Sequence, residues 1–283
     1  MKKPYIFNGL RWLSRKLLWF TDHQKERRRT NKTAYEILSK LNFQDTKNLT
    51  ERELIIASKL VDPTTISVSY EEIGGLSHVV DGIRKNVIIP AHKNKHEKTL
   101  TPNSPKGILL HGPHGCGKTM ISEAITKEEG IYCLKLDARL PLFYRECGSN
   151  MSSNNIEKLV DALFSLAQKM QPFIIFIDHF EFTRSKHYNY FENKWLHTEN
   201  NLIIIGETNH IFWRNEPFEM LLKKELIQSH HISLPDTNQR REILATRMKF
   251  HNYKCQGCLH DLAIETSGFS GDDLDMIFSN LIR

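Results

Sequence analysis

Apolar and polar positions follow two patterns along most of the chain, short continuous apolar runs and longer stretches with helical spacing. Five apolar runs predict buried strands at 107–110, 131–136, 173–178, 202–206 and 231–234. Helical stretches lie between most of them, and this alternation predicts a parallel sheet covered by helices on both faces. After Pro235 only helical patterns follow, at 237–250, at about 259–266 and from 272 onward. We therefore expect an α/β domain followed by a small group of helices.

The N-terminal segment combines an apolar stripe at helical spacing with many positive charges. The stripe consists of Ile6, Leu10, Leu13, Leu17 and Phe20, and Trp12 and Trp19 flank it. The segment is shorter and more charged than the roughly 20 mainly apolar residues that span a bilayer, and it lacks the cleavage site of a secretory signal. It predicts a helix lying in the interface of a membrane. The alternative is a helix packed on the domain that follows.

Two capping boxes predict helix starts between this segment and the first strand. Thr33-x-x-Glu36 and Thr50-x-x-Glu53 each place a hydroxyl three residues before a carboxylate, so that both groups can bind free backbone N–H groups. The second helix is expected to run to Val61 and to stop before Asp62-Pro63.

Charge and cysteine content narrow the classes of function. The 283 residues include 39 Lys and Arg against 33 Asp and Glu, a net charge of +6. A basic balance is typical of proteins that bind nucleic acid or anionic membranes. Much of the excess lies in the N-terminal segment, so a membrane surface is favoured and no nucleic acid is expected. Five scattered cysteines, an odd number, indicate a reducing compartment rather than a disulfide framework.

The most specific chemistry lies in the turn after the strand at 107–110. Residues 112–119 fit the phosphate-loop pattern G-x-x-x-x-G-K-[ST] at every fixed position, between a strand pattern and a helix pattern. Glycines let backbone N–H groups turn inward around phosphate oxygens, and the helix N-terminus adds partial positive charge. Lys118 is expected to reach the outer phosphates and Thr119 to ligate Mg²⁺. The predicted cofactor-binding residues here are Gly112, Pro113, His114, Gly115, Cys116, Gly117, Lys118, Thr119 and Met120.

Further short motifs accompany the phosphate loop along the chain. In order they are Leu60–Pro63, Glu72–Leu76, the phosphate loop, Phe164–Ala167, Ile174–Asp178, Thr208-Asn209 and Gly268–Leu274. The set resembles that of the AAA ATPases from about Leu49 to the C-terminus, and a full set is far more specific than one motif. The stretches around 61–63 and 164–172 are most similar to AAA protein translocases of the outer mitochondrial membrane. Those are relatives of spastin and katanin that extract mislocalised tail-anchored proteins.

The resemblance implies how the chain is organised. Residues 1–48 would be a basic, membrane-proximal segment and linker, 49–235 the large α/β domain with its parallel sheet flanked by helices, and 236–283 a truncated helical lid. It also implies ATP and Mg²⁺ as cofactors and a homo- or hetero-oligomeric ring. The implied place is the cytosolic face of the mitochondrial outer membrane, with a cytosolic or peripheral-membrane location as the alternative.

The same resemblance implies roles for residues outside the phosphate loop. Asp178 would be a second partner of Mg²⁺, and Asn209 would orient the attacking water. Gly74, with Gly75, would line the adenine pocket. Gly271, at the start of the last helix, would face the nucleotide from the lid.

Two departures from the family pattern concern hydrolysis. His179 stands where the family has a catalytic glutamate, and Lys223 and Lys224 stand where it has an arginine pair that acts on a neighbouring subunit's nucleotide. Lysine keeps the charge but loses the two-pronged guanidinium geometry. A positioned base contributes roughly 10²–10⁴ in rate and an arginine finger roughly 10³–10⁵. We therefore expect either a translocase with weak hydrolysis or a pseudoATPase that regulates or partners a more complete relative.

Two further groups of residues are candidates for contacts. Phe143 and Tyr144 lie about where the family's pore loop grips a polypeptide, and the alternative is that both pack against the sheet. The spacing of His251, Cys255, Cys258 and His260 supplies four possible zinc ligands. A single C-x-x-C pair is weak support, however, and His260 is close to Cys258 for tetrahedral closure.

Overall fold

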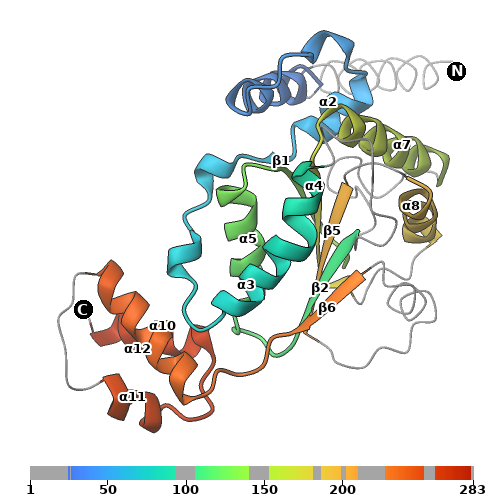
Figure 1. The fold of residues 1–283 in the computed structure, drawn as a ribbon. Helices are drawn as coiled ribbons and strands as arrows, with labels where there is room; N and C mark the ends of the chain where they lie inside the picture. The colour runs from blue at the N-terminus through green and yellow to red at the C-terminus, as the bar shows by residue number, and fades with distance from the viewer. Residues whose placement is uncertain are drawn as a thin grey trace, which may run out of the picture.

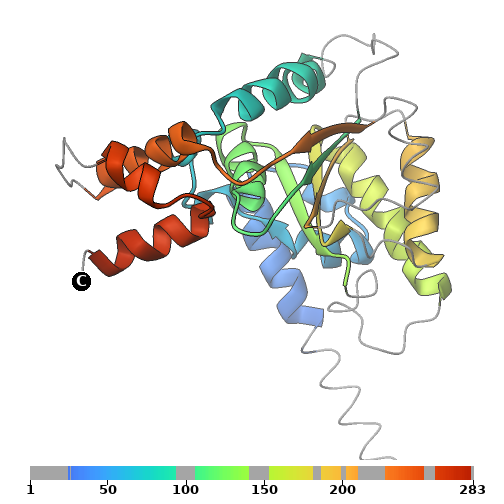
Figure 2. The same ribbon diagram turned by 90° about the horizontal axis from the view of Figure 1, so that it is seen from below.

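The structure is a computed structural model that describes residues 25, 27–93, 106–139, 153–180, 186–198, 202–209, 227–251 and 259–281. Figures 1 and 2 show a central sheet with helices on both faces and a separate group of helices at one end. The predicted α/β class, with a parallel sheet flanked by helices and a helical lid, is confirmed.

The sheet has six strands among the described residues, in the order β1-β3-β4-β5-β2-β6. They are β1 (Leu60–Val61), β2 (Gly107–His111), β3 (Tyr132–Asp137), β4 (Phe173–Asp178), β5 (Leu202–Thr208) and β6 (Ile227–His231). β1 pairs antiparallel with β3, and the other pairings are parallel. The phosphate-loop strand β2 therefore lies between β5 and β6, and β5 separates it from β4.

Two strand predictions need correction. The last strand is Ile227–His231 rather than 231–234, because an edge strand with one covered face alternates buried and exposed positions and shows no continuous apolar run. The helix predicted to run to Val61 ends at Ala57, and Leu60–Val61 form the short antiparallel strand β1, which was not predicted because two residues carry no strand periodicity.

Each face of the sheet has its own hydrophobic core. One core lies under α3 (Ser77–Ile83), α4 (Ile89–Lys93) and α5 (Lys118–Glu128), the helix that follows the phosphate loop. The other lies under α2 (Glu51–Ala57), α7 (Ser153–Lys169) and α8 (Lys186–Leu196). Figure 1 shows the two sets of helices on opposite sides of the strands. Side chains that alternate along a strand therefore point toward one set or the other.

A helix over residues 27–40 packs against the second core. Ala34 and Leu38 on this helix are fully buried, and Lys40 forms an ion pair with Asp62 at 2.9 Å, just after β1. The helix start predicted at Thr33 is wrong, because this residue lies inside the helix and its hydroxyl donates to the carbonyl of Arg29. The apolar stripe at residues 6–20 lies outside the described residues. Among the helices that are described, none has the length and apolar character needed to cross a membrane.

The second predicted capping box is confirmed at the start of α2. The backbone N–H of Thr50 donates to the Glu53 carboxylate at 2.6 Å, and the backbone N–H of Glu53 donates to the Thr50 hydroxyl. Glu53 is buried and also accepts from Ser165 and Lys169 of α7. The box therefore caps α2 and also ties it to α7.

The lid consists of α10 (Thr237–Phe250), α11 (Leu259–Glu265) and α12 (Gly271–Leu281). Its small core is built from Leu244, Ala263 and Leu274. Buried Arg240 holds it together by donating to the carbonyls of Ala263 and Pro235. Of the four possible zinc ligands, Cys255 and Cys258 lie outside the described residues, and the His251 ring packs against Phe278.

Candidate functional site

The phosphate loop connects β2 to α5 and depends on its glycines. Gly112, Gly115 and Gly117 have φ values of 146°, 71° and 91°, in the region that side chains rarely adopt. A Cβ atom on Gly112 would lie 1.9 Å from the carbonyl oxygen of Ile232. Pro113 and Cys116 lie between these glycines, and His114 is exposed on the outside of the loop. The loop therefore needs glycines for its backbone conformation, and at Gly112 also for its close packing against the chain after β6.

Lys118, the first residue of α5, lies at the centre of the loop. It is only 3% exposed, and its Nζ atom donates to the carbonyl oxygens of Gly112 at 2.9 Å and Pro113 at 2.5 Å. Burial lowers the pKa of Lys118, whereas Glu207, Cys116, Asp272 and Asp178 act in the opposite direction. The geometry therefore holds a cationic side chain inside the ring of backbone groups where phosphates bind.

A carboxylate absent from the predicted site lies against the phosphate loop. The Thr119 hydroxyl donates to Glu207 on β5, with its oxygen 2.8 Å from one carboxylate oxygen and 3.0 Å from the other. Glu207 is 7% exposed. Burial raises its pKa and nearby Asp178 adds to the increase, while the bond from Thr119 and the charge of Lys118 oppose it. A glutamate directly after the apolar run 202–206 was the available sequence signal.

Asp178 ends β4 at the same edge of the sheet, and the chain reverses directly after it. Its carboxylate accepts the backbone N–H of His179 at 2.8 Å, and the His179 Nε2 atom lies 3.7 Å from the same oxygen. His179 has a φ of 54°, an uncommon conformation for a residue other than glycine. The imidazole at the position of the family's catalytic glutamate is thus turned toward Asp178.

The other predicted catalytic residues are divided between described and undescribed segments. Asn209 directly follows β5 and is half-buried, so it lies at the edge where β2 and β4 also end. Lys223 and Lys224 lie outside the described residues, as do Phe143 and Tyr144.

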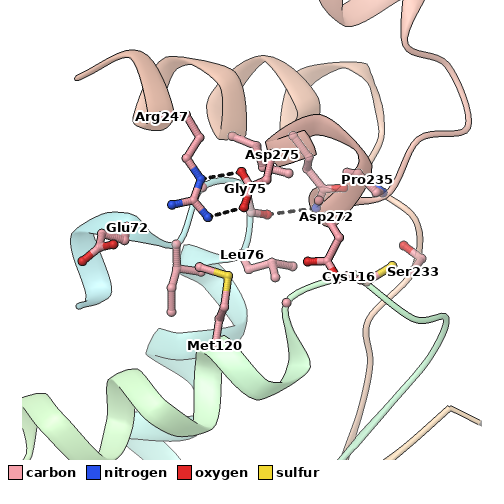
Figure 3. A pocket seen from close by; sticks show the side chains of 17 residues that line it. Glu72, Gly75, Leu76, Cys116, Met120, Ser233, Pro235, Arg247, Asp272 and Asp275 are labelled. Atoms are coloured by element: carbon pink, nitrogen blue, oxygen red, sulfur yellow. Dashed lines mark hydrogen bonds and ion pairs between the residues drawn. The ribbon is translucent and has the colours of Figure 1, made fainter. Parts of the chain in front are cut away.

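A pocket of about 550 Å³ lies between the phosphate loop and the lid. Figure 3 shows Met120 on α5 below it and Arg247 and Asp275 of the lid above it. Ile73, Leu76, Met120 and Ile243 supply an apolar lining, which suits a flat aromatic ring such as adenine. The predicted cofactor-binding residues that line it are Gly74, Gly115, Cys116, Gly117, Met120 and Gly271.

Close contacts join the lid to the large domain around this pocket. Gln239 of α10 donates to the carbonyl of Gly75 at 2.9 Å, and the backbone N–H of Asp272 donates to the carbonyl of Gly115 at 3.1 Å. A Cβ atom on Gly74 would lie 2.7 Å from the Ile243 Cα atom. The lid therefore rests directly on the turn at 74–75 and on the phosphate loop.

The donor atoms present fit a magnesium nucleotide. Glycines 112, 115 and 117 allow the positive φ values of the loop, and Lys118 supplies positive charge. Thr119, Asp178 and Glu207 supply hydroxyl and carboxylate oxygens, the ligand type that Mg²⁺ prefers.

Substitution of Gly74 by alanine should weaken nucleotide binding, because the added methyl group would push against the backbone of α10 and displace the lid. We expect the dissociation constant of a fluorescent ATP analogue to rise about tenfold, equivalent to about 1.4 kcal/mol. The control is Gly82→Ala in α3, where the nearest atom to an added Cβ is 3.9 Å away. Equal affinity of the two variants, measured by fluorescence titration, would contradict a role of this turn in the pocket.

Comparison with known proteins identifies the family. Residues 108–224 match the family "ATPase family associated with various cellular activities (AAA)". The chain is 33% identical to the outer mitochondrial transmembrane helix translocases of Danio rerio and Homo sapiens, over 95% of this chain and 76% of each relative. It is 26% identical to a mitochondrial sorting homolog of Caenorhabditis elegans, over 87% of this chain and 72% of that protein. The chain therefore belongs to the AAA ATPase family and resembles the outer mitochondrial transmembrane helix translocases within it.

Proposed function

We propose that the chain is an ATP-binding translocase at the cytosolic face of the mitochondrial outer membrane. There it would extract mislocalised tail-anchored proteins, with slow ATP hydrolysis of its own. The observation that carries this proposal is the complete phosphate loop, closed by a lid, in a chain that is 33% identical to translocases of transmembrane helices over 95% of its length.

The site residues would divide the binding of ATP between two regions. Lys118 and the loop N–H groups would bind the phosphates, and the apolar pocket under the lid would bind the adenine. Mg²⁺ would neutralise phosphate charge, and Thr119 and Asp178 would hold it. Because Gly115 contacts Asp272 of the lid, the occupied loop and the lid position would be coupled.

The replacement of a glutamate by His179, directly after β4, supports slow hydrolysis. A neutral imidazole at residue 179 can accept a proton, but it lacks the negative charge of a glutamate. The backbone bond from His179 to the Asp178 carboxylate and the left-handed φ turn the side chain toward Asp178. Asn209 remains at this edge to orient a water molecule.

AAA proteins typically form rings, and we propose the same assembly here, with one kind of subunit or with a related partner. Phe143 and Tyr144 would grip an extended polypeptide at the pore, and Lys223 and Lys224 would reach the nucleotide of a neighbouring subunit. The N-terminal stripe would lie on the membrane surface.

The position of His179 also favours a second candidate function. In this alternative the chain is a pseudoATPase that binds ATP stably and works as a partner subunit of a more complete AAA relative. Binding and hydrolysis would then be separated, since the phosphate loop is complete while the water-activating group is replaced.

Extraction from liposomes tests the proposal. The assay would use the full chain and a fluorescent protein with a single C-terminal transmembrane helix in liposomes of outer-membrane composition. We expect release into the supernatant that needs ATP and is lost in Lys118→Ala. Release without ATP would contradict the proposal, and release only after addition of a hydrolytically complete relative would favour the partner-subunit alternative.

A further inference from the structure

Glu207 is an ionisable residue near the carboxyl end of a buried strand. It lies on β5 with Leu110 of β2 as its register partner on one side. On the other side Ile177 of β4 pairs with Gly206, which places Asp178 next to Glu207. Ile205, two residues earlier on the same face, belongs to the core under α5, so the Glu207 side chain points toward the helix that carries Thr119.

The surroundings compensate the charge of this carboxylate only in part. Burial of an ionised group is costly unless it is paired or coordinates a metal. In the described part of the chain the Thr119 hydroxyl is the hydrogen-bond donor to Glu207, and one hydroxyl has a single proton to share between two oxygens. Lys118 is near enough to interact with Glu207, but its Nζ atom is bonded to carbonyls of the loop. The charges of Lys118 and Lys135 oppose the rise in the pKa of Glu207, and burial and Asp178 raise it, so two carboxylates and two ammonium groups act on one another beside the phosphate loop.

The Asp178 carboxylate has different hydrogen-bond partners from the Glu207 carboxylate. One of its oxygens accepts the backbone N–H of His179 and faces the His179 ring. Its side chain is 31% exposed, whereas Glu207 is buried. The carboxylate in direct contact with the expected metal ligand Thr119 is therefore on β5 and not at the end of β4.

We propose that Glu207 is the main positioning residue for Mg²⁺ at this phosphate loop, through its hydrogen bond with the Thr119 hydroxyl and its charge. The inference rests on the proposed binding of ATP with Mg²⁺. When the Thr119 hydroxyl donates its hydrogen bond to Glu207, both lone pairs of the hydroxyl oxygen stay available for a cation. The two carboxylates on neighbouring strands then supply the negative charge that a divalent ion neutralises.

The test compares nucleotide binding with and without Mg²⁺. The dissociation constant of a fluorescent ATP analogue would be measured in Mg²⁺ and in EDTA for wild type, Glu207→Gln, Glu207→Ala and Asp178→Asn. We expect the gain in affinity from Mg²⁺ to fall about tenfold or more in both Glu207 variants, and by less in Asp178→Asn. Affinity in EDTA should be unchanged or tighter, since a negative charge near the phosphates has been removed. This ratio reports metal positioning, which a purely structural role of Glu207 would leave unchanged.

A direct metal readout and a matched control complete the experiment. Titration of Mn²⁺, followed by electron paramagnetic resonance with a non-hydrolysable ATP analogue bound, should show weaker Mn²⁺ binding in Glu207→Gln. Glu192→Gln removes a carboxylate from α8, on the other face of the sheet, and should leave both readouts unchanged.

The possible results separate the two proposals. If Mg²⁺ raised the nucleotide affinity of the Glu207 variants by the same factor as that of wild type, the inference would be overturned. A larger gain in Glu207→Ala would overturn it too, because Glu207 would then compete with the metal for Thr119. Absence of nucleotide binding in wild type, in Mg²⁺ and in EDTA alike, would instead remove the proposed function.

Discussion

Replacement of Lys118 by alanine should abolish the ATP-dependent increase in melting temperature. Wild type should be stabilised by about 2.7 kcal/mol when ATP is at a hundred times its dissociation constant, which corresponds to several degrees for a chain of this size. The side chain of Lys118 is buried at the centre of the loop and is bonded to two of its carbonyls. Without the ammonium group, the phosphates lose their main charged partner inside the loop.

The comparison is made within each variant, with and without ATP, in a thermal-shift titration. This matters because Lys118 also joins the ends of the loop and its removal can change the stability of the free protein. Lys127→Ala is the matched control, since Lys127 is on the same helix but is exposed and donates to the Ser67 carbonyl. An equal ATP-dependent shift in wild type and Lys118→Ala would show that the nucleotide does not bind at this loop.

Replacement of His179 by glutamate should raise ATP turnover. A carboxylate at this position supplies the base that the site lacks, an effect of roughly 10²–10⁴ in well-positioned cases. We expect a smaller gain, about tenfold to a hundredfold, because residue 179 has a left-handed φ of 54° that a glutamate must also adopt. Glu207 does not substitute for this base, because its carboxylate is held by Thr119. The measurement is phosphate release at saturating ATP.

Two comparisons make this result specific. His197→Glu introduces the same change of charge at the end of α8 and should leave turnover unchanged. His179→Glu combined with Lys223→Arg and Lys224→Arg should be faster still, provided that a ring forms. Wild-type turnover of about 1 s⁻¹ or more, within the usual range of enzymes, would exclude the expectation of weak hydrolysis.

The parts of the fold that follow from local pattern were predictable. The continuous apolar run that became β4 and the helical stretch that became α10 appear in the structure at the predicted bounds, and a capping box of Asp236 and Gln239 fixes the start of α10. β6 was misplaced because its largely polar sequence Ile-Gln-Ser-His-His contains no apolar run, which suits a position at the edge of the sheet. That position depends on strand order, which local pattern does not contain.

The site residues also fall into a part that the sequence predicted and a part that it did not. The phosphate loop is contiguous in sequence, so its glycines, Lys118 and Thr119 could be assigned from spacing alone. Glu207 is 88 residues from Thr119, and their contact exists only because β5 lies next to β2 in the sheet. The reversal at His179 depends on a single backbone angle that residue type does not predict.

The helix over residues 27–40 has a mechanical consequence. Its buried Ala34 and Leu38, its ion pair to Asp62, and the bond from Tyr132 to the carbonyl of Leu41 fix it to the edge of the sheet, at the end of the molecule away from the lid (Figure 1). Because it is held by apolar packing, an ion pair and a hydrogen bond, we expect this helix to move together with the sheet. We therefore expect a load applied to this helix to pass to β1 and β3 at the edge of the sheet.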